Sequence, residues 1–418
     1  MKELSVIVVV ADGLGDRPVP SLGMKTPLEL VDFSSVADVV SKSAVGLWDP
    51  IQPGIRPGSD TAHLALFGVN PLNNYPGRGP FEAIGAGATL KPGDLAFRGN
   101  FATVNSDLIV VDRRAGRKIL EAKQLVEYLN GNIGEIDGVK VEIYHTTEHR
   151  VAVVFRGEDL SDAVSDTDPH TEGVRVLEAA PLASSESAAR TARVVNAFTK
   201  RVHELLRDYL VNTRKSERDL PPANIVLLRG AGKMVRYPKL QERRELKIER
   251  SVAISATALV KGVCTLLGFE AVTPEGATGG VDSDLIAKAR VAVDYYRRGY
   301  DLIYIHVKGT DSASHDGNPS AKIAVIEKLL KAVSYLVDRV DLEKTVIAVL
   351  GDHTTPVMVR DHTSDPVPVM IYAPGIMADG FTKLSEREAR RGSLGRLRNT
   401  ELFGILMDYS SRAEKFGA

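Results

Sequence analysis

The sequence predicts an α/β protein: a mostly parallel sheet covered by helices on both faces, with a smaller α+β domain inserted into it. Apolar runs rich in β-branched residues, typical of strands buried on both faces, occur near both ends of the chain. They span residues 5–10, 301–307, 345–352 and 366–374. Helical patterns separate the later runs, and strands alternating with helices indicate a parallel sheet.

The composition is that of a globular protein with no strong charge bias. Its 418 residues are 44% hydrophobic and 26% charged, with a net charge of -1, so we expect no nucleic-acid or membrane partner. The first apolar run ends in Asp12 and a turn, as a strand does, rather than in a signal-peptide cleavage site. The single cysteine, Cys264, excludes an internal disulfide and predicts a cytoplasmic protein. The sequence gives no indication of oligomeric state.

The elements of the middle region differ from those at the two ends. Residues 139–157 predict an antiparallel hairpin, residues 185–210 an amphipathic helix, and residues 212–224 a polar, proline-bearing turn. We therefore expect an inserted α+β domain over 96–240.

The remaining residues, 1–95 and 241–418, are expected to form one discontinuous core domain. Within it, a long helical pattern starts at Ser320, which is expected to cap that helix. Cys264 lies in an apolar helical stretch, which predicts that its side chain is buried.

Carboxylates follow three of the predicted core strands. Asp12, Asp311 and Asp352 lie where sheets of this class place their sites, beyond the carboxyl ends of the strands. Asp311 is followed four residues later by His315, so one helical turn would bring both side chains to one face.

Two further histidines complete this set of polar residues. His353 is adjacent to Asp352, and His362 follows nine residues later. Carboxylate oxygens mixed with imidazoles suit Mn²⁺, Zn²⁺ or Mg²⁺. Three aspartates and three histidines, with a serine, are enough ligands for two ions, and two ions can clamp the attacking and leaving oxygens of a phosphoryl group.

Ser59, in "PGSDTAHLALFG", has two interpretations. It is either a helix cap or a nucleophile held at a helix N-terminus, where backbone N–H groups can receive a phosphate. Nearby, His63 is expected to support the site rather than bind metal. His306, within a strand, is expected to be a buried core histidine, and Lys308 is a candidate for balancing the carboxylate charge.

Several motifs, in order along nearly the whole chain, carry a family resemblance: "ADGLGDRP", "GSDTAHLALFG", "GRGPFEAIGAG", "SDTDPH", "LLRGAG", "TPEGATGGVDSDL", "KGTDSASHDGN", "GDHTTP" and "HTSDPVPV". Together they resemble the archaeal-type cofactor-independent phosphoglycerate mutases of the alkaline phosphatase superfamily. The resemblance implies an alkaline-phosphatase-like core and interconversion of 3-phosphoglycerate and 2-phosphoglycerate without 2,3-bisphosphoglycerate. It also implies two divalent ions, Mn²⁺, Zn²⁺, Co²⁺ or Mg²⁺.

The resemblance further assigns roles to residues. Ser59 is implied as the nucleophile that becomes phosphoserine. The ligands of one metal are implied to be Asp311, His315 and His362, and those of the other Asp12, Asp352, His353 and the Ser59 hydroxyl. A bound divalent ion would lower the pKa of the serine hydroxyl, which is a weak nucleophile at neutral pH.

A mutase must also keep water from phosphoserine and hold the glycerate. A domain that closes over the site would do both, which gives the insert a role. Arginine suits the carboxylate, and the candidates are Arg150, Arg229 and Arg78. The segment "SDTDPH" adds three residues that could bind glycerate hydroxyls or carry a proton: Asp166, Asp168 and His170.

Three other functions fit parts of this pattern. A phosphohydrolase of the same superfamily, acting on another phosphate ester, would share the metal site, and the insert and subfamily motifs favour the mutase over it. A phosphonopyruvate decarboxylase-like activity is suggested only because similar sequences have carried that name, and the serine and two-metal set does not require it. A metal-binding regulatory protein would have no need of Ser59.

Overall fold

A computed structural model describes residues 3–209, 220–415 and 417, and the chain divides into two compact units. The core unit comprises Met1–Tyr75 and Tyr237–Ala418, and the insert unit comprises Pro76–Arg236. The sequence placed the start of the insert at residue 96. The insert unit begins earlier because helix α4 (Gly79–Gly85) packs closely on strand β3 (Leu95–Val104). The contact is so close that a Cβ at Gly79 would lie 1.9 Å from the Ala96 carbonyl oxygen.

The described part of the core unit contains an eight-stranded sheet in the order β10-β9-β11-β1-β12-β13-β2-β14. Its strands are β1 (Ser5–Ala11), β2 (Ser43–Asp49), β9 (Ser251–Ile254), β10 (Glu270–Val272), β11 (Leu302–Val307), β12 (Thr345–Gly351), β13 (Val367–Tyr372) and β14 (Gly395–Arg398). Five of the seven neighbouring pairs are parallel, which confirms the predicted mostly parallel sheet. Strand β13 is the exception, because it pairs antiparallel with both β12 and β2.

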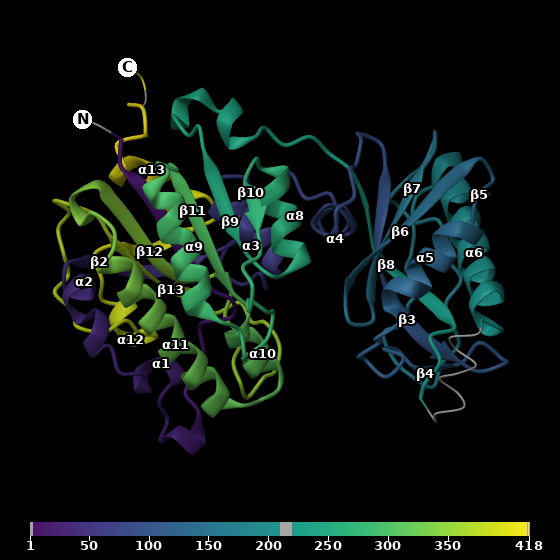
Figure 1. The fold of residues 1–418 in the computed structure, drawn as a ribbon, viewed down its shortest axis with the longest axis horizontal. Coiled ribbons are helices and arrows are strands. Elements are labelled where there is room, and N and C mark those ends of the chain that lie inside the picture. Colours follow the sequence, from purple (N-terminus) through teal and green to yellow (C-terminus); the bar gives the residue numbers. More distant parts are fainter. Residues whose placement is uncertain (1–2, 210–219, 416, 418) are drawn as a thin grey trace. The chain divides into compact units, whose positions relative to one another are not determined.

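Helices cover both faces of the core sheet, as predicted. The side chains of Ile303 and Ile305 on β11 pack in one cluster with α9 and α11, which lie in front of the sheet in Figure 1. The intervening Tyr304 points to the opposite face, where its hydroxyl contacts His63 of α3. The helices of this unit are α1 (Pro27–Leu30), α2 (Ala37–Ser41), α3 (Ser59–Leu66), α8 (Ala258–Leu266), α9 (Leu285–Arg297), α10 (Gly309–His315), α11 (Pro319–Val337), α12 (Glu386–Ala389) and α13 (Glu401–Tyr409).

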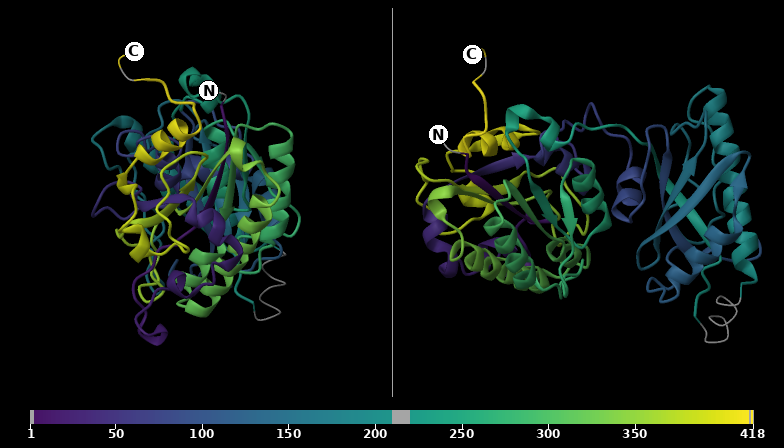
Figure 2. Two further views of the ribbon diagram at one scale, coloured as in Figure 1. Left: turned by 90° about the vertical axis from the view of Figure 1, so that its left-hand side faces the viewer. Right: turned by 45° about the horizontal axis from the view of Figure 1, so that its top comes forward.

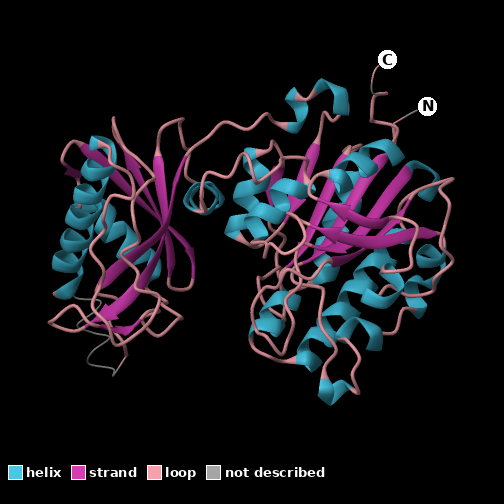
Figure 3. Ribbon diagram, turned by 180° about the vertical axis from the view of Figure 1, so that it is seen from behind, coloured by secondary structure: helices cyan, strands magenta, loops and turns pink. Residues whose placement is uncertain are grey.

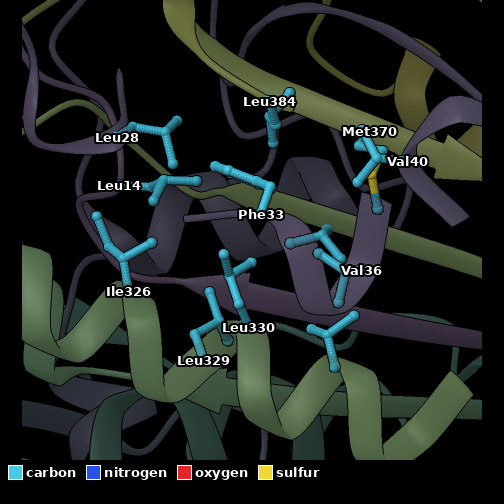
Figure 4. Close-up of a pocket in the computed structure, with 12 residues that line it drawn as sticks. Leu14, Leu28, Phe33, Val36, Val40, Ile326, Leu329, Leu330, Met370 and Leu384 are labelled. Atoms are coloured by element: carbon cyan, nitrogen blue, oxygen red, sulfur yellow. The ribbon is translucent and has the colours of Figure 1, made fainter. Parts of the chain in front are cut away.

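The core between α11 and the N-terminal segment is apolar. Figure 4 shows Leu14 and Phe33 facing Ile326, Leu329 and other side chains around a small apolar pocket. This packing ties the loop after β1, which carries Asp12, to helix α11. Segments near the two ends of the chain lie side by side in this unit, since the Leu4 N–H donates to the Ser410 carbonyl at 3.0 Å (Figure 2).

The insert unit is built on a separate, largely antiparallel sheet, shown in magenta with its cyan helices in Figure 3. Its strands are β3 (Leu95–Val104), β4 (Val110–Asp112), β5 (Glu135–Ile136), β6 (Val139–Thr147), β7 (Arg150–Arg156) and β8 (Ile225–Lys233). Strands β6 and β7 form the predicted hairpin. Helices α5 (Ala122–Asn132) and α6 (Glu186–Arg207) pack on one face of this sheet and α4 on the other.

The predicted helix over 185–210 is α6, capped by Ser185, whereas the helix predicted from Ser320 begins earlier than expected. The side chain of Asn318 caps α11 by accepting from the Ala321 N–H, and Pro319 occupies the first turn, so Ser320 is already helical. Cys264 is buried in α8, as predicted. Most of the polar turn predicted over 212–224 lies outside the described residues. Among the described residues, no helix is both long enough and apolar enough to span a membrane.

Candidate metal centre

The sheet brings the predicted ligands together at one edge. Strands β11 and β12 flank β1 in parallel, and the last residue of β1, Ala11, pairs with Val307 on one side and Gly351 on the other. The residues that follow these three strands therefore emerge side by side at the carboxyl edge of the sheet. Asp12 and Asp352 come directly after their strands, and Asp311 follows β11 in the first turn of α10.

Asp311, His315 and His362 form one group whose potential ligand atoms lie within 4.8 Å of one another. Helix α10 places Asp311 and His315 on one face, with His315 Nε2 3.4 Å from Asp311 Oδ1. His362 Nε2 lies 3.5 Å from the same oxygen. These are the three residues expected from the resemblance to hold one metal.

A second group, also within 4.8 Å, comprises Asp12, Asp311 and His353. His353 Nε2 lies 3.2 Å from Asp12 Oδ1 and 3.5 Å from Asp352 Oδ2. The expected set for this metal was Asp12, Asp352 and His353, so the tighter grouping has Asp311 in place of Asp352. Asp311 thus belongs to both groups, and the two are contiguous.

The protein fixes the orientation of the histidines. Nδ1–H of His315 donates to the Arg360 carbonyl at 2.7 Å, and Nδ1–H of His362 donates to the Pro57 carbonyl at 2.8 Å. A carbonyl only accepts, so Nδ1 carries the proton in both rings, and Nε2 is directed at Asp311. A hydrogen bond that holds the remote ring nitrogen in this way is the usual arrangement of a metal-binding histidine.

Ser59 is the first residue of α3, after Gly58 at the N-cap, and it is 6% exposed. Its Oγ lies 3.2 Å from His353 Nε2, so the hydroxyl faces the second group. It does not cap its helix, because no side-chain cap hydrogen bond forms there. His63 lies one turn later, and its Nδ1–H donates to the Ser59 carbonyl while its Nε2 accepts from the Tyr304 hydroxyl. Neither ring nitrogen of His63 is therefore available to a metal, and its role is to hold α3 against the sheet.

His306 and Lys308 surround Asp12. Nε2–H of His306 donates to Asp12 Oδ2 at 2.8 Å. The Lys308 ammonium lies 3.0 Å from Asp12 Oδ1 and 2.7 Å from Asp311 Oδ2, where it offsets the charge of both carboxylates. Burial lowers the pKa of His306 to about 4, so this ring is neutral at physiological pH.

The carboxylates have opposite pKa shifts. Burial disfavours ionisation of both Asp12 and Asp311, yet the neighbouring Lys308 charge and the histidine hydrogen bonds hold both pKa values well below the ordinary range. Burial and the charge of Asp12 raise the pKa of Asp352. For His362, burial is outweighed by the hydrogen bond and charge of Asp311, which raise its pKa to about 9.

The residues at this edge fit divalent ions. Asp352 is fully buried, and its Oδ1 accepts the Gly13 N–H at 3.0 Å, but its Oδ2 has no hydrogen-bond donor in the described structure. A buried carboxylate oxygen without a partner is costly, and a bound cation would satisfy it. Oxygen and imidazole donors together suit Mn²⁺, Zn²⁺, Co²⁺ or Mg²⁺ better than soft thiophilic metals.

The insert unit holds a separate cluster of arginines on its sheet. Arg98 on β3 lies opposite Arg229 of β8, and Arg150 begins β7. Among the described residues, the Nε atoms of these three arginines are buried and have no hydrogen-bond partner. Arg98 Nε lies 3.8 Å from Glu82 Oε1, and Arg229 Nε lies 3.9 Å from Asp168 Oδ2. Arg78, at the N-cap of α4, donates to Glu82 at 3.0 Å.

The charge of this cluster is unbalanced. Burial and the positive charges of Arg78, Arg150 and Arg229 lower the pKa of Arg98, although Glu82 opposes this. An excess of converging guanidinium groups is a site for an anion.

The three residues of "SDTDPH" that were expected to bind glycerate hydroxyls or carry a proton differ in their surroundings. Asp168 is fully buried, and both its oxygens accept from Arg113, at 3.0 and 2.6 Å. This pairing leaves its carboxylate occupied within the protein. Asp166 accepts the Gly230 N–H at 3.0 Å and lies 3.0 Å from His170 Nε2, and both side chains are partly exposed.

Sequence reasoning did not identify Arg98, which lies in the arginine cluster, or Thr355, whose hydroxyl donates to Asp311 Oδ1 at 3.0 Å. Arg98 had a signal, because it is a charged residue within the apolar strand "LAFRGNF". Thr355 had none, since a threonine in a loop after a strand is ordinary.

The fold and the site define the class of the protein: an α/β enzyme with a candidate metal centre of carboxylates and imidazoles at the carboxyl edge of its sheet. Comparisons with known proteins agree. The family model for 2,3-bisphosphoglycerate-independent phosphoglycerate mutase matches residues 41–212. Relatives bearing that name are 52% identical in Ignicoccus hospitalis and 50% identical in Saccharolobus islandicus, each over 100% of both chains.

Two solved structures are also similar over nearly the whole chain. A Pyrococcus horikoshii protein has a TM-score of 0.86 at 35% identity, covering 100% of both chains. The cofactor-independent phosphoglycerate mutase of Thermoplasma acidophilum has a TM-score of 0.70 at 34% identity, over 97% of this chain and 100% of that one. The chain belongs to the 2,3-bisphosphoglycerate-independent phosphoglycerate mutases, which confirms the family predicted from its motifs.

Proposed function

We propose that the protein interconverts 3-phosphoglycerate and 2-phosphoglycerate without 2,3-bisphosphoglycerate, through a phosphoserine at Ser59. The observation that carries this proposal is the position of the Ser59 hydroxyl. It sits at the start of a helix, 3.2 Å from His353 Nε2, beside two contiguous groups of ligand residues. The family to which the chain belongs supports the choice of substrate.

The metal centre in this proposal has two divalent ions. Asp311, His315 and His362 would hold one ion, and Asp12, Asp352, His353 and the Ser59 hydroxyl would hold the other. Bound there, the ions would supply charge neutralisation at the phosphoryl oxygens and lower the pKa of the serine hydroxyl. Mn²⁺, Co²⁺, Zn²⁺ and Mg²⁺ are all candidates for these sites.

Ser59 would take the phosphoryl group from the substrate. The bond between phosphorus and the C3 oxygen breaks as the bond to Ser59 Oγ forms, and the serine proton passes to the departing alkoxide. The reverse transfer, onto the C2 hydroxyl of the retained glycerate, gives 2-phosphoglycerate. The N-terminal turn of α3 favours the negative charge of the phosphoryl group next to Ser59.

Binding of the substrate carboxylate is assigned to the insert unit. In the described structure, the Nε atoms of Arg150 and Arg229 are buried without a hydrogen bond, as is that of Arg98, which we add to the expected set. Arg78 contributes further positive charge. Asp166 and His170 remain candidates for glycerate hydroxyls because both are partly exposed, whereas the pairing of Asp168 with Arg113 makes it a support for the cluster.

The test is an enolase-coupled assay on metal-depleted protein given 3-phosphoglycerate and Mn²⁺ without 2,3-bisphosphoglycerate. Free phosphate is measured in the same tube. We expect 2-phosphoglycerate with little free phosphate, and loss of both signals in Ser59→Ala. Release of phosphate alone would instead establish a phosphohydrolase that uses the same centre. We further propose a cytoplasmic location, from the single buried cysteine and the glycolytic substrate.

A further inference from the structure

Thr355 lies between the two ligand groups and contacts both. It is fully buried in the loop that follows β12. Its hydroxyl donates to Asp311 Oδ1 at 3.0 Å, and it lies 2.9 Å from His353 Nδ1. Asp311 belongs to both groups and His353 to the second, so one hydroxyl touches ligands on either side of the centre.

The direction of these two hydrogen bonds follows from the donors available. A hydroxyl has one proton, and an ionised carboxylate only accepts, so the Thr355 proton lies toward Asp311. The Lys308 ammonium, 2.7 Å from Asp311 Oδ2, pairs with that carboxylate as an anion. The Thr355 oxygen must then accept from Nδ1–H of His353, which leaves Nε2 of that ring with its lone pair free for a metal.

The backbone of Thr355 is itself held in place. Its carbonyl accepts from the buried Lys322 ammonium at 3.1 Å, and the same ammonium binds the Gly15 carbonyl at 3.0 Å. The Thr355 N–H donates to Gly15 as well, at 3.2 Å. The hydroxyl is also tightly enclosed, because a Cβ on Gly13 would lie 2.8 Å from Thr355 Oγ. Thr355 therefore cannot move without moving the loop that carries Asp12.

We propose that Thr355 is the positioning residue that couples the two metal sites, orienting Asp311 for one ion and His353 for the other through a single hydroxyl. The inference rests on the two-metal centre proposed above. The other histidines of the centre are held by backbone carbonyls, each within one group. Thr355 differs from them because its one hydroxyl serves both groups. Loss of that hydroxyl should therefore weaken both sites together.

The test is calorimetric titration of metal-stripped, full-length protein with Mn²⁺, comparing wild type with Thr355→Val and Thr355→Ser. Valine keeps the shape and removes the hydroxyl, whereas serine keeps the hydroxyl. Removing a partner that orients a metal ligand typically lowers metal affinity by about 10- to 100-fold. We expect a loss of that size at both sites in Thr355→Val, with Thr355→Ser within about 3-fold of wild type.

A matched control is Thr345→Val. Thr345 is also fully buried, and its hydroxyl donates to the Asp341 carbonyl at 2.7 Å, at the opposite end of β12. This variant should lower thermal stability without changing either Mn²⁺ affinity. If Thr355→Val does not fold, Thr355→Ala removes the same hydroxyl with less bulk and takes its place in the titration.

The outcomes separate this inference from the two-metal proposal. Wild-type protein that binds fewer than two Mn²⁺ ions would overturn the two-metal centre itself. Wild-type protein that binds two ions, with Thr355→Val unchanged or weakened at one site only, would overturn the coupling role alone. Equal losses in Thr355→Ser and Thr355→Val, or in Thr345→Val, would show that the hydroxyl does not act specifically.

Discussion

Replacing Lys322 by methionine should destabilise the core unit strongly. The Lys322 ammonium is fully buried and donates to the Gly15 carbonyl, to Asp16 Oδ2 at 2.8 Å and to the Thr355 carbonyl. Methionine fills much of the same space but leaves all three acceptors without this donor. Removing one partner of a buried ion pair typically costs about 3–5 kcal/mol. We expect about 3 kcal/mol, because the Arg17 and Val357 N–H groups still donate to the carboxylate.

Lys288→Met is the matched control for this variant. Lys288 is also buried, on the same unit, but its ammonium donates to a single carbonyl, that of His306, at 2.6 Å, and the described structure gives it no carboxylate partner. An unsatisfied carbonyl costs about 1–3 kcal/mol, so the loss should be smaller. Adding Asp16→Asn to Lys322→Met should restore at least about 1 kcal/mol, since it removes the buried charge that was left unpaired.

Denaturant unfolding followed by tryptophan fluorescence measures these differences. The only tryptophan of the chain, Trp48, is buried in β2, so its emission reports on the core unit. The reasoning would be refuted if Lys322→Met cost no more than Lys288→Met. It would also be refuted if the Asp16→Asn addition made the protein less stable still.

Three further predictions concern charge. Burial raises the pKa of Glu386 to about 7 from about 4.5, so the folded state loses up to about 3 kcal/mol as the pH rises through that interval. The stability of Glu386→Gln relative to wild type should therefore rise by up to that amount over the same interval, and a difference that stays constant with pH would contradict this. The pKa of His362 is about 9 without metal, so a proton competes with the metal for this ring at neutral pH. Mn²⁺ affinity should therefore rise by up to about tenfold per pH unit from pH 7 and level off above pH 9. Calorimetry should detect the release of a proton on Mn²⁺ binding. Lys308→Met should lower the melting temperature measured in chelator, because two buried carboxylates lose their counter-charge. The increase in melting temperature on adding Mn²⁺ should be larger in this variant than in wild type. Equal increases in the two proteins would show that Lys308 does not offset the charge of the carboxylates.

The sequence was sufficient to predict the parts of the fold that depend on local pattern. Strands β1, β11 and β12 are continuous apolar runs, and the aspartates after them meet because parallel neighbours end at the same edge. The antiparallel direction of β13 was not predictable, since a buried run has the same composition in either direction. The start of the insert was missed because the contact between α4 and β3 joins residues that no local pattern connects.

For the candidate site too, local sequence pattern was sufficient to predict only some of the residues. The candidate histidines and aspartates were predicted because carboxylates and imidazoles are the residue types that bind divalent metals. Thr355 and Arg98 make their contacts with residues of distant segments, and no local sequence pattern predicts those contacts. Lys322 had a readable signal, because it lies three, four and seven residues before Val325, Ile326 and Leu329 on the apolar face of α11. A lysine at that spacing is expected to be buried only if it finds partners, and the structure supplies three.

The two points where the chain leaves and re-enters the core unit lie next to each other. The core unit breaks at Tyr75 and resumes at Tyr237, and the Tyr237 hydroxyl donates to the Asn74 carbonyl. A short loop could therefore replace Pro76–Arg236 without stretching the sheet that carries the ligands. This arrangement would allow the insert to be excised while the core sheet and the candidate metal ligands at its edge keep their places. The excised core unit would show whether the candidate ligands bind Mn²⁺ without the insert unit.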